Sequence, residues 1–361
     1  MRLGDSVHPK LPWLRVLHDL DEARATTLPG AHIDALSHRA RSLGDQLREG
    51  PRVLGVKTLD NATLPYPTRF AFNGAMPLPW PFVLMTHRTL LVRLATSDGT
   101  KHLLFNPTDA AASRRTPFFA KLATALEKRF PFAERLVGAH FPSLEEQLAK
   151  VGVRPEDIDL LAFDHFHTQD VRPLVGTGEA RGRFPNATLL APEREWRAWD
   201  SLHPMQRAWF IEDGKRGVPD ERVVTYDADL SLGDGCLLLR TPGHTVGNQT
   251  LFVHGAEGVF GCSENGCSID NWSPRASRIP GLRAYAEQYE VDVVLNANTP
   301  ELGGEQFASM VLERSLVDRV PGRPDLAQMF PSSEVTTSAL APLVRPSVEL
   351  RHRDSGAFAR A

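Results

Sequence analysis

Cysteine is scarce in this chain, and the few that occur do not form a pattern of their own. The 361 residues contain three cysteines, Cys236, Cys262 and Cys267. An odd and small number in a long chain argues against a disulfide framework. No two of them form a CxxC pair, so the sequence does not predict a structural zinc site built on cysteine.

Long apolar runs and a strong charge of either sign are also missing. The first residues, MRLGDSVHPKLPW, lack the apolar core of a signal peptide, and no stretch reaches the roughly 20 apolar residues that span a bilayer. We therefore expect a cytoplasmic protein with no membrane partner. With a net charge of -3 and a pI near 6.5, the chain does not attract polyanions, so we do not expect nucleic acid as a partner. We expect a small-molecule substrate instead.

The composition that is present suits a large globular core, since 42% of residues are hydrophobic and 24% are charged. We expect three regions. Residues 1–58 form a helical N-terminal extension, because apolar residues recur at helical spacing from Trp13 to Leu20 and from Ile33 to Leu47. Residues 59–330 form the main domain, and residues 331–361, rich in Ser, Thr, Pro and Arg, form a peripheral C-terminal arm.

Within the main domain, short apolar runs alternate with helical segments. Thr89–Ala95 and His102–Phe105 read as a hairpin around Ser97-Asp98-Gly99-Thr100. Strands are then expected near 158–163, 187–191, 223–226, 236–240, 250–254, 258–262 and 291–295, and helices over 118–130, 143–151, 192–210 and 281–290. This pattern predicts an α/β fold in which two sheets pack face to face with helices outside.

The run HFHTQD, residues 165–170, is the strongest chemical signal in the chain. It follows the apolar run Ile158–Phe163, which predicts a buried strand, so the histidines lie on the loop that leaves it. Residues alternate faces in extended backbone, so His165 and His167 can point the same way while Phe166 turns into the core. Two imidazoles on one side, followed by Asp170, indicate a metal site.

Further polar residues stand where later strands end. His244 lies between Gly243 and Gly247 in TPGHTVGNQTL, on a tight loop that lets an imidazole approach an ion closely. The strand at 258–262 runs into Ser263 and Glu264, and VVLNANTPE places Asn298 after the last predicted strand. Glu264 is the natural carboxylate ligand among them.

Taken together, PEDID at 155–159, the double histidine and TPGHTVG resemble the metallo-β-lactamase superfamily over roughly residues 85–300. The resemblance implies an αββα sandwich, a catalytic main domain, and a first metal ion, normally Zn²⁺, held by His165, His167 and His244. The second-site positions differ. Gln169 and Asp170 stand where relatives carry Asp and His, Ser263 or Glu264 stands for the bridging carboxylate, and Asn298 stands for the final histidine.

Three interpretations of these departures stay open. In the first interpretation, the second metal site is rebuilt with oxygen ligands, Asp170 and Glu264, which would favour harder ions such as Mn²⁺ or Fe²⁺. In the second interpretation one ion binds, and Asp170 or Glu264 is a fourth ligand or the base that orients water. The third makes the chain a non-catalytic partner subunit with a degenerate site. An iron-dependent, oxygen-using member of the superfamily is a further alternative.

The leading hypothesis is a metallo-hydrolase that uses one or two ions to activate water. Its substrate would be a small ester, lactone, amide or activated aryl ether. Asp170 or Glu264 would orient the water or take its proton, and Gln169 or Asn298 would donate to the developing oxyanion. Ser263 is expected beside the ligands, and Trp80, in the aromatic segment Phe70–Phe82, beside the substrate. We expect a homo-oligomer, with a hetero-oligomer as the alternative.

Overall fold

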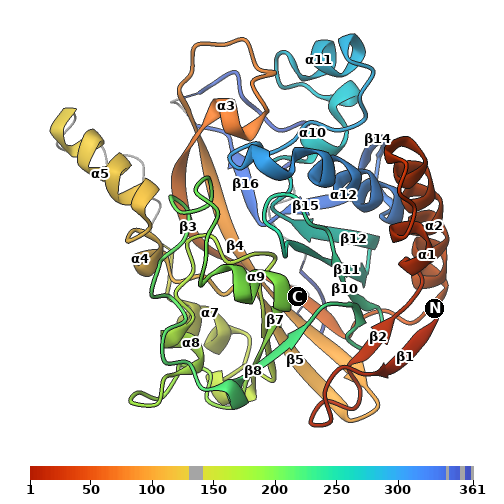
Figure 1. Ribbon diagram of the computed structural model, residues 1–361, viewed down its shortest axis with the longest axis vertical. Helices are drawn as coiled ribbons and strands as arrows, with labels where there is room; N and C mark the ends of the chain where they lie inside the picture. Colours follow the sequence, from red (N-terminus) through yellow and green to blue (C-terminus); the bar gives the residue numbers. More distant parts are fainter. Residues whose placement is uncertain (130–140, 339–340, 350–353, 359–361) are drawn as a thin grey trace.

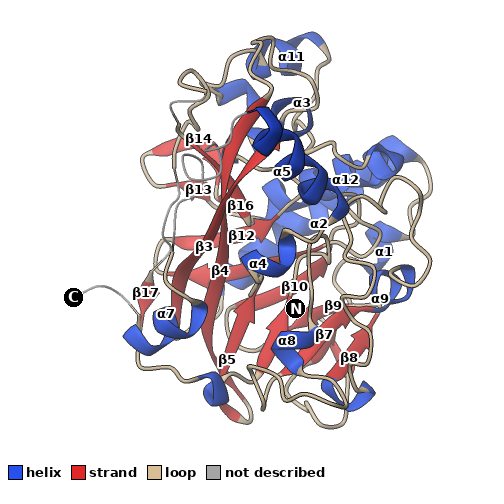
Figure 2. Cartoon of the chain, turned by 90° about the vertical axis from the view of Figure 1, so that its left-hand side faces the viewer, coloured by secondary structure: helices blue, strands red, loops and turns tan. Residues whose placement is uncertain are grey.

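A computed structural model describes the chain except residues 130–140, 339–340, 350–353 and 359–361. Two mixed β-sheets lie against each other, and helices cover their outer faces (Figures 1 and 2). The predicted two-sheet α/β sandwich is therefore confirmed. Within the described residues no helix is long and apolar enough to cross a membrane.

The first sheet has seven strands in the order β1-β2-β9-β10-β11-β12-β15. All neighbours are antiparallel except β12 and β15. Its strands are β1 (Leu3–Ser6), β2 (Arg15–Leu17), β9 (Asp229–Ser231), β10 (Cys236–Arg240), β11 (Gln249–Gly255), β12 (Gly258–Ser263) and β15 (Met329–Pro331).

The second sheet has eight strands, ordered β17-β3-β4-β5-β6-β7-β8 with β16 also paired to β4. Parallel pairing runs from β5 through β8, and the long β3 and β4 cross the molecule in Figure 2. Its strands are β3 (Gly55–Pro67), β4 (Phe82–Thr96), β5 (Gly99–Phe105), β6 (Leu160–Ala162), β7 (Thr188–Pro192), β8 (Val223–Tyr226), β16 (Ser333–Thr336) and β17 (Ser355–Gly356). The predicted β4–β5 hairpin is confirmed.

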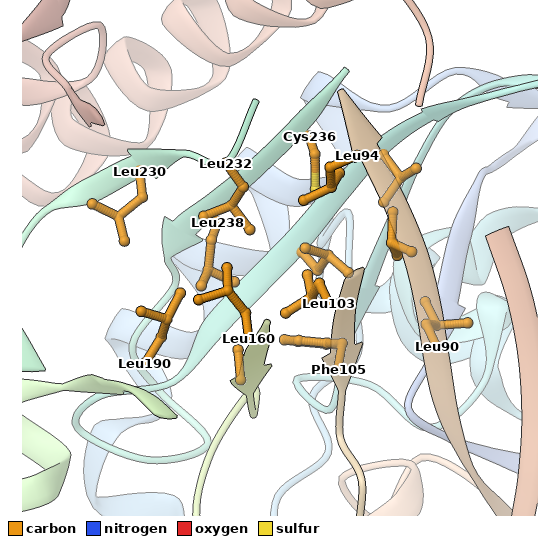
Figure 3. Close-up of a cluster of buried hydrophobic side chains, with 14 of the residues drawn as sticks. Leu90, Leu94, Leu103, Phe105, Leu160, Leu190, Leu230, Leu232, Cys236 and Leu238 are labelled. Atoms are coloured by element: carbon orange, nitrogen blue, oxygen red, sulfur yellow. The ribbon is translucent and has the colours of Figure 1, made fainter. Parts of the chain in front are cut away.

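The core lies between the two sheets, where apolar side chains from both meet (Figure 3). Leu103 and Leu160 of the second sheet face Leu238 and Cys236 of the first, and all four are buried. Alternation along each strand directs these residues inward. Cys236 is buried in this cluster and contributes to its packing.

Helices cover the two outer faces. On the first sheet lie α2 (Pro29–Glu49) and α12 (Gly303–Leu316), which share an apolar cluster with β10, β11 and β12. On the second sheet lie α7 (Leu144–Lys150), α8 (Arg172–Val175) and α9 (Glu193–Ala198). The helix predicted over 143–151 is confirmed as α7, and a capping box begins it, since Ser143 and Glu146 bond each other's backbone N–H groups.

Shorter elements complete the fold. The remaining helices are α1 (Asp21–Arg24), α3 (Thr68–Ala71), α4 (Ala110–Ser113), α5 (Pro117–Arg129), α10 (Ile269–Trp272) and α11 (Leu282–Gln288). Single 3₁₀ turns span Pro155–Asp157, Asp220–Arg222, Pro274–Ala276 and Pro300–Leu302, and β13 (Arg319–Val320) pairs with β14 (Arg323–Ala327). The helix predicted for 118–130 is α5, and Phe130 lies outside the described residues.

The N-terminal region corrects one prediction. The helix predicted from Trp13 to Leu20 is wrong, because Arg15–Leu17 is the strand β2, which pairs with β9. Leu14, Leu17 and Leu20 are nevertheless fully buried, so tertiary pairing decided the conformation of an apolar run whose spacing also suits a helix. The helix predicted over Ile33–Leu47 is confirmed as α2.

Two further elements differ from the prediction. The helix expected over 192–210 ends at Ala198, and residues 201–214 form consecutive turns, as the sequence His203-Pro204 favours. The strand expected over 291–295 does not form. Val293 and Val294 are buried, yet the Val294 N–H donates to the Asn271 carbonyl instead of joining a sheet.

The segment expected to begin a peripheral arm enters both sheets. β15 lies beside β12, the chain crosses between the sheets at Ser332, and β16 then pairs with β4. Residues 331–336 are therefore part of the sandwich, contrary to the expectation. How the chain divides into the three predicted domains stays a prediction.

Candidate metal centre

Three buried imidazoles meet where the two sheets come together. His165 and His167 lie on the loop after β6, and His244 lies on the loop between β10 and β11. Ring nitrogens of the three lie within 4.8 Å of one another. The residues are 8%, 3% and 2% exposed. The structure thus brings together the three histidines that the sequence singled out.

The loop that carries His244 is pressed against α12. Gly243 has φ 147°, and a Cβ there would lie 2.2 Å from the Cα of Gln306. Glycine is therefore required for the helix to pack this close. The Gln306 side chain donates to the carbonyls of Asn265 and Asn296, which joins α12 to the strand ends around the site.

Hydrogen bonds on the outer side of two rings fix their tautomers. His165 Nδ1 donates to the carboxylate of Asp164 at 2.7 Å, and His167 Nε2 donates to the Gln206 side-chain oxygen. The opposite nitrogens, His165 Nε2 and His167 Nδ1, therefore keep their lone pairs. His167 Nδ1 lies 3.1 Å from His244 Nε2, close to the roughly 3.3 Å between two nitrogens on one tetrahedral zinc ion.

Burial keeps two of the rings neutral. It lowers the pKa of His167 and of His244 well below the usual value, and the charge of the nearby His165 lowers both further. For His165 burial also acts to lower the pKa, but the carboxylates of Asp164, Glu195 and Glu264 outweigh it and raise the value. Neutral imidazoles are the form that binds metal ions.

Glu195, at the start of α9, ties the two histidine loops together. One carboxylate oxygen accepts the Phe166 N–H at 2.7 Å, and the other accepts the Gly247 N–H at 3.0 Å and the Thr245 hydroxyl. Glu195 is 1% exposed, so these bonds are shielded from water. A single buried carboxylate thus sets the distance between the HFH loop and the GHT loop.

Gln206 connects His167 to a second carboxylate. Its side-chain nitrogen donates to Glu301 at 2.6 Å and, more weakly, to the His244 carbonyl at 3.4 Å. Thr299 also donates to the His244 carbonyl, at 2.6 Å. These bonds orient the amide of Gln206 so that its oxygen faces His167.

Glu264 is buried beside this group. Its carboxylate accepts the Ser333 N–H at 2.8 Å, and its backbone carbonyl accepts from Asn296 at 3.1 Å. Burial and the charge of Asp164 raise the pKa of Glu264 to about 8. Among the described residues no carboxylate joins the three imidazoles within the same 4.8 Å. A ligand role for Glu264 stays a prediction.

Asp170 faces two guanidinium groups. Its carboxylate accepts two bonds from Arg172, both at 2.8 Å, and pairs with Arg115. Arg172 also pairs with Asp213 at 2.8 Å, which makes a small charged network around α8. The structure therefore gives Asp170 a structural set of partners, and its predicted role as ligand or base is not shown by them.

The other predicted residues lie in different settings. Gln169 donates to Thr108 at 2.9 Å, and Ser263 is fully buried and accepts the Asn265 N–H. Asn298 is 8% exposed, and among the described residues its side-chain oxygen has no hydrogen-bond partner. Trp80 lines a pocket outside the imidazole group.

Sequence reasoning missed Asp164, Glu195, Gln206, Glu301 and Ser332. Asp164 is the one with a local signal, since it directly precedes His165 and ends the predicted strand. Ser332 donates to its second carboxylate oxygen from the segment between β15 and β16. Glu195 lies on α9, Gln206 on the turns after it, and Glu301 on the 3₁₀ turn before α12, so only packing brings them to the histidines.

Comparisons with known proteins give distant structural likenesses. No protein-family model and no curated protein matches. A probable metal-dependent hydrolase from Staphylococcus aureus shares 11% identity, covering 63% of this chain and 78% of that one, with a TM-score of 0.43. A Bacillus thuringiensis protein, AiiA, crystallised with N-decanoyl-L-homoserine, shares 15% identity over 66% and 88%, also at 0.43. A hydrolase of the beta lactamase superfamily, AbOPH, shares 16% over 66% and 84%, at 0.40.

Because these likenesses are remote, we base the function on the site itself. Its donor set is three inward-facing imidazole nitrogens, two of them fixed by outer partners. That set suits a borderline-soft divalent ion such as zinc, and it also accepts iron. The residues present therefore fit a bound metal ion.

Proposed function

We propose that this protein is a metal-dependent hydrolase of small organic esters, lactones or related compounds. The observation that carries the proposal is the convergence of His165, His167 and His244. The nitrogens His167 Nδ1 and His244 Nε2 lie 3.1 Å apart, close enough to bind one ion. Three protein ligands leave a fourth position open, as in catalytic rather than structural zinc sites.

The three imidazoles would hold the ion, which when bound supplies an acidic water molecule and polarises a carbonyl. Asp164 holds His165 in the tautomer with a free Nε2, and Gln206 does the same for Nδ1 of His167. Glu195 holds the two loops at a constant separation. These residues orient the site before substrate arrives, which avoids reorganisation during the reaction.

We assign proton transfer to Glu264 in preference to Asp170. Glu264 is buried with one bond to Ser333, whereas Asp170 is occupied by Arg115 and Arg172. The pKa of Glu264 is raised to about 8. The positive charge of a metal ion bound by the imidazoles would lower this pKa towards neutral pH. A carboxyl group with such a pKa can both hold and release a proton near pH 7. Asn298 is the proposed oxyanion donor.

The test combines elemental analysis of the purified protein with a panel of esters, lactones and aryl ethers. We expect about one or two zinc ions per chain and hydrolysis of at least one class. His167→Ala should lose both metal and activity. The matched control is His203→Ala, which removes an exposed histidine and should change neither.

Other outcomes would identify the alternatives. Iron with redox-dependent spectra would favour an oxygen-using enzyme. Absence of every metal across the tested pH range would favour a non-catalytic subunit. Full activity of the His167→Ala protein on a substrate found in the panel would overturn the proposed mechanism.

A further inference from the structure

A second feature with a chemical character of its own is a pocket of about 770 Å³ beside α3 and α5. Its walls come from the segment 67–82, from α5 and from Ala208. Most of the lining is apolar or aromatic, and it includes Phe70, Met76, Trp80 and Phe118. A pocket of this size and lining is typical of small-molecule sites.

Two polar atoms in the lining lack partners. Thr68 is 4% exposed, and its hydroxyl has no hydrogen-bond partner among the described residues. The indole N–H of Trp80 is likewise buried and unpaired in that part of the chain. Leaving such groups unpaired costs about 1–3 kcal/mol each.

Two cations line the same pocket. Arg69 and Lys121 are exposed, and neither has an ion-pair partner among the residues described. The Arg69 guanidinium lies 4.6 Å from the centre of the Phe70 ring, which holds it against the pocket wall. The described lining contains no aspartate or glutamate. The charged side chains of the described lining are therefore cations.

Trp209 lies between the lining of this pocket and the imidazole group. Its ring stacks on Phe118 with centroids 4.3 Å apart and contacts Phe70 at 6.0 Å, on the pocket side. It also lies 6.1 Å from the His167 ring. The Trp209 carbonyl accepts the Thr168 N–H at 2.7 Å, which fixes this wall to the HFH loop.

From these contacts we infer that the pocket binds an apolar ligand that carries a carboxylate or similar organic anion. The apolar body packs against Phe70, Met76 and Phe118, and the anion pairs with Arg69 and Lys121. We take the ligand to be the substrate, because Trp209 packs against both the pocket residue Phe118 and His167. Its identity as substrate rests on the proposed function, whereas binding in the pocket does not.

The experiment measures calorimetric binding of three matched probes to the full chain: 4-phenylbutyrate, 4-phenylbutanol and 4-phenylbutylamine. We expect the anion to bind about five- to tenfold more tightly than the alcohol, and the amine most weakly. The double variant Arg69→Gln/Lys121→Gln should bind the anion and the alcohol about equally. The control Lys150→Gln, an exposed lysine on α7, should keep the preference.

A second variant tests the location. Ala208→Phe should weaken all three probes because it fills the pocket, with folding checked by circular dichroism. Equal binding of acid and alcohol to the unmodified protein would overturn the inference, as would unchanged binding to the Ala208→Phe protein. We expect the same affinities after treatment with a chelator. If the protein binds no metal and hydrolyses nothing but still binds the anionic probe, only the proposed function is refuted. If it binds metal and hydrolyses a substrate but does not bind the probe, only the inference about the pocket is refuted.

Discussion

Asp164 and His165, adjacent in sequence, are joined by a buried hydrogen bond of 2.7 Å between the Asp164 carboxylate and the His165 Nδ1. The same carboxylate accepts the Ser332 hydroxyl, so it is fixed from two sides. A carboxylate behind a ligating histidine sets its tautomer and strengthens it as a ligand. This relationship leads to the first prediction.

Asp164→Asn should lower zinc affinity about 10- to 100-fold, because a neutral amide holds the imidazole less firmly. Competition with a chromophoric chelator measures this. Ser332→Ala is the control, since it removes a hydrogen bond to Asp164 and leaves the charge, and a smaller loss is expected. An Asp164→Asn protein that binds zinc as well as the parent would show that the Asp164 carboxylate does not support His165 as a ligand.

Glu195→Gln should destabilise the protein by about 1–3 kcal/mol, because an amide cannot accept from Phe166, Gly247 and Thr245 together without leaving a buried donor unpaired. Urea unfolding with and without zinc measures the change. Glu193→Gln, on the same helix but on its exposed side with Arg197, should be nearly neutral. If both variants unfold at the same urea concentration as the parent, Glu195 does not hold the loops.

His87 should make the protein sensitive to acid. Burial lowers its pKa to about 4, and the neighbouring charges of His165 and Arg88 act in the same direction while Asp164 opposes them. Below about pH 6.5 the unfolded chain takes up a proton that the folded protein refuses, so stability falls as the pH drops to about 4. The full loss from this group is about 3 kcal/mol.

Urea unfolding between those two pH values tests the role of His87. His87→Gln keeps a side-chain amide for the Ser333 hydroxyl and the Asn106 carbonyl, which the imidazole contacts at 3.0 and 3.4 Å. The variant should lose less stability on acidification than the parent. An equal slope in both proteins would assign the acid sensitivity to other groups.

Asp170→Asn should leave the metal content unchanged and cost about 1–2 kcal/mol of stability, since its two arginine partners are partly exposed. Elemental analysis and thermal unfolding measure the two effects. Arg172→Gln removes the Arg172 bonds to Asp170 and also the Arg172–Asp213 pair, and it too should leave the metal content unchanged. Loss of an ion in the Asp170→Asn protein would restore Asp170 as a ligand and favour a second metal site.

The cluster of three histidines could be predicted because its signals are local. A strand end places His165 and His167 on one side, and glycines frame His244, so short motifs were enough. The residues that hydrogen-bond to these rings or fix their loops could not be predicted in this way. Glu195, Gln206 and Glu301 come from three separate segments, and only the packing of α9, the following turns and α12 brings them to the histidines.

Errors in the elements have a similar cause. An apolar run such as Leu14–Leu20 or Val291–Leu295 shows that a segment is buried but leaves its conformation undecided. Residues 15–17 pair with β9 as a strand, whereas the Val294 N–H donates to the Asn271 carbonyl. Both choices depend on residues far away in the chain.

The crossing at Ser332 also affects the order in which the site is completed. A ribosome that has made all three histidines has not yet made Ser332 and Ser333, whose groups bond Asp164 and Glu264. A nascent chain therefore displays the imidazoles before the carboxylates behind them are fixed. Metal loading during synthesis would therefore meet a looser site than loading after release, and the segment between β15 and β16 would complete it.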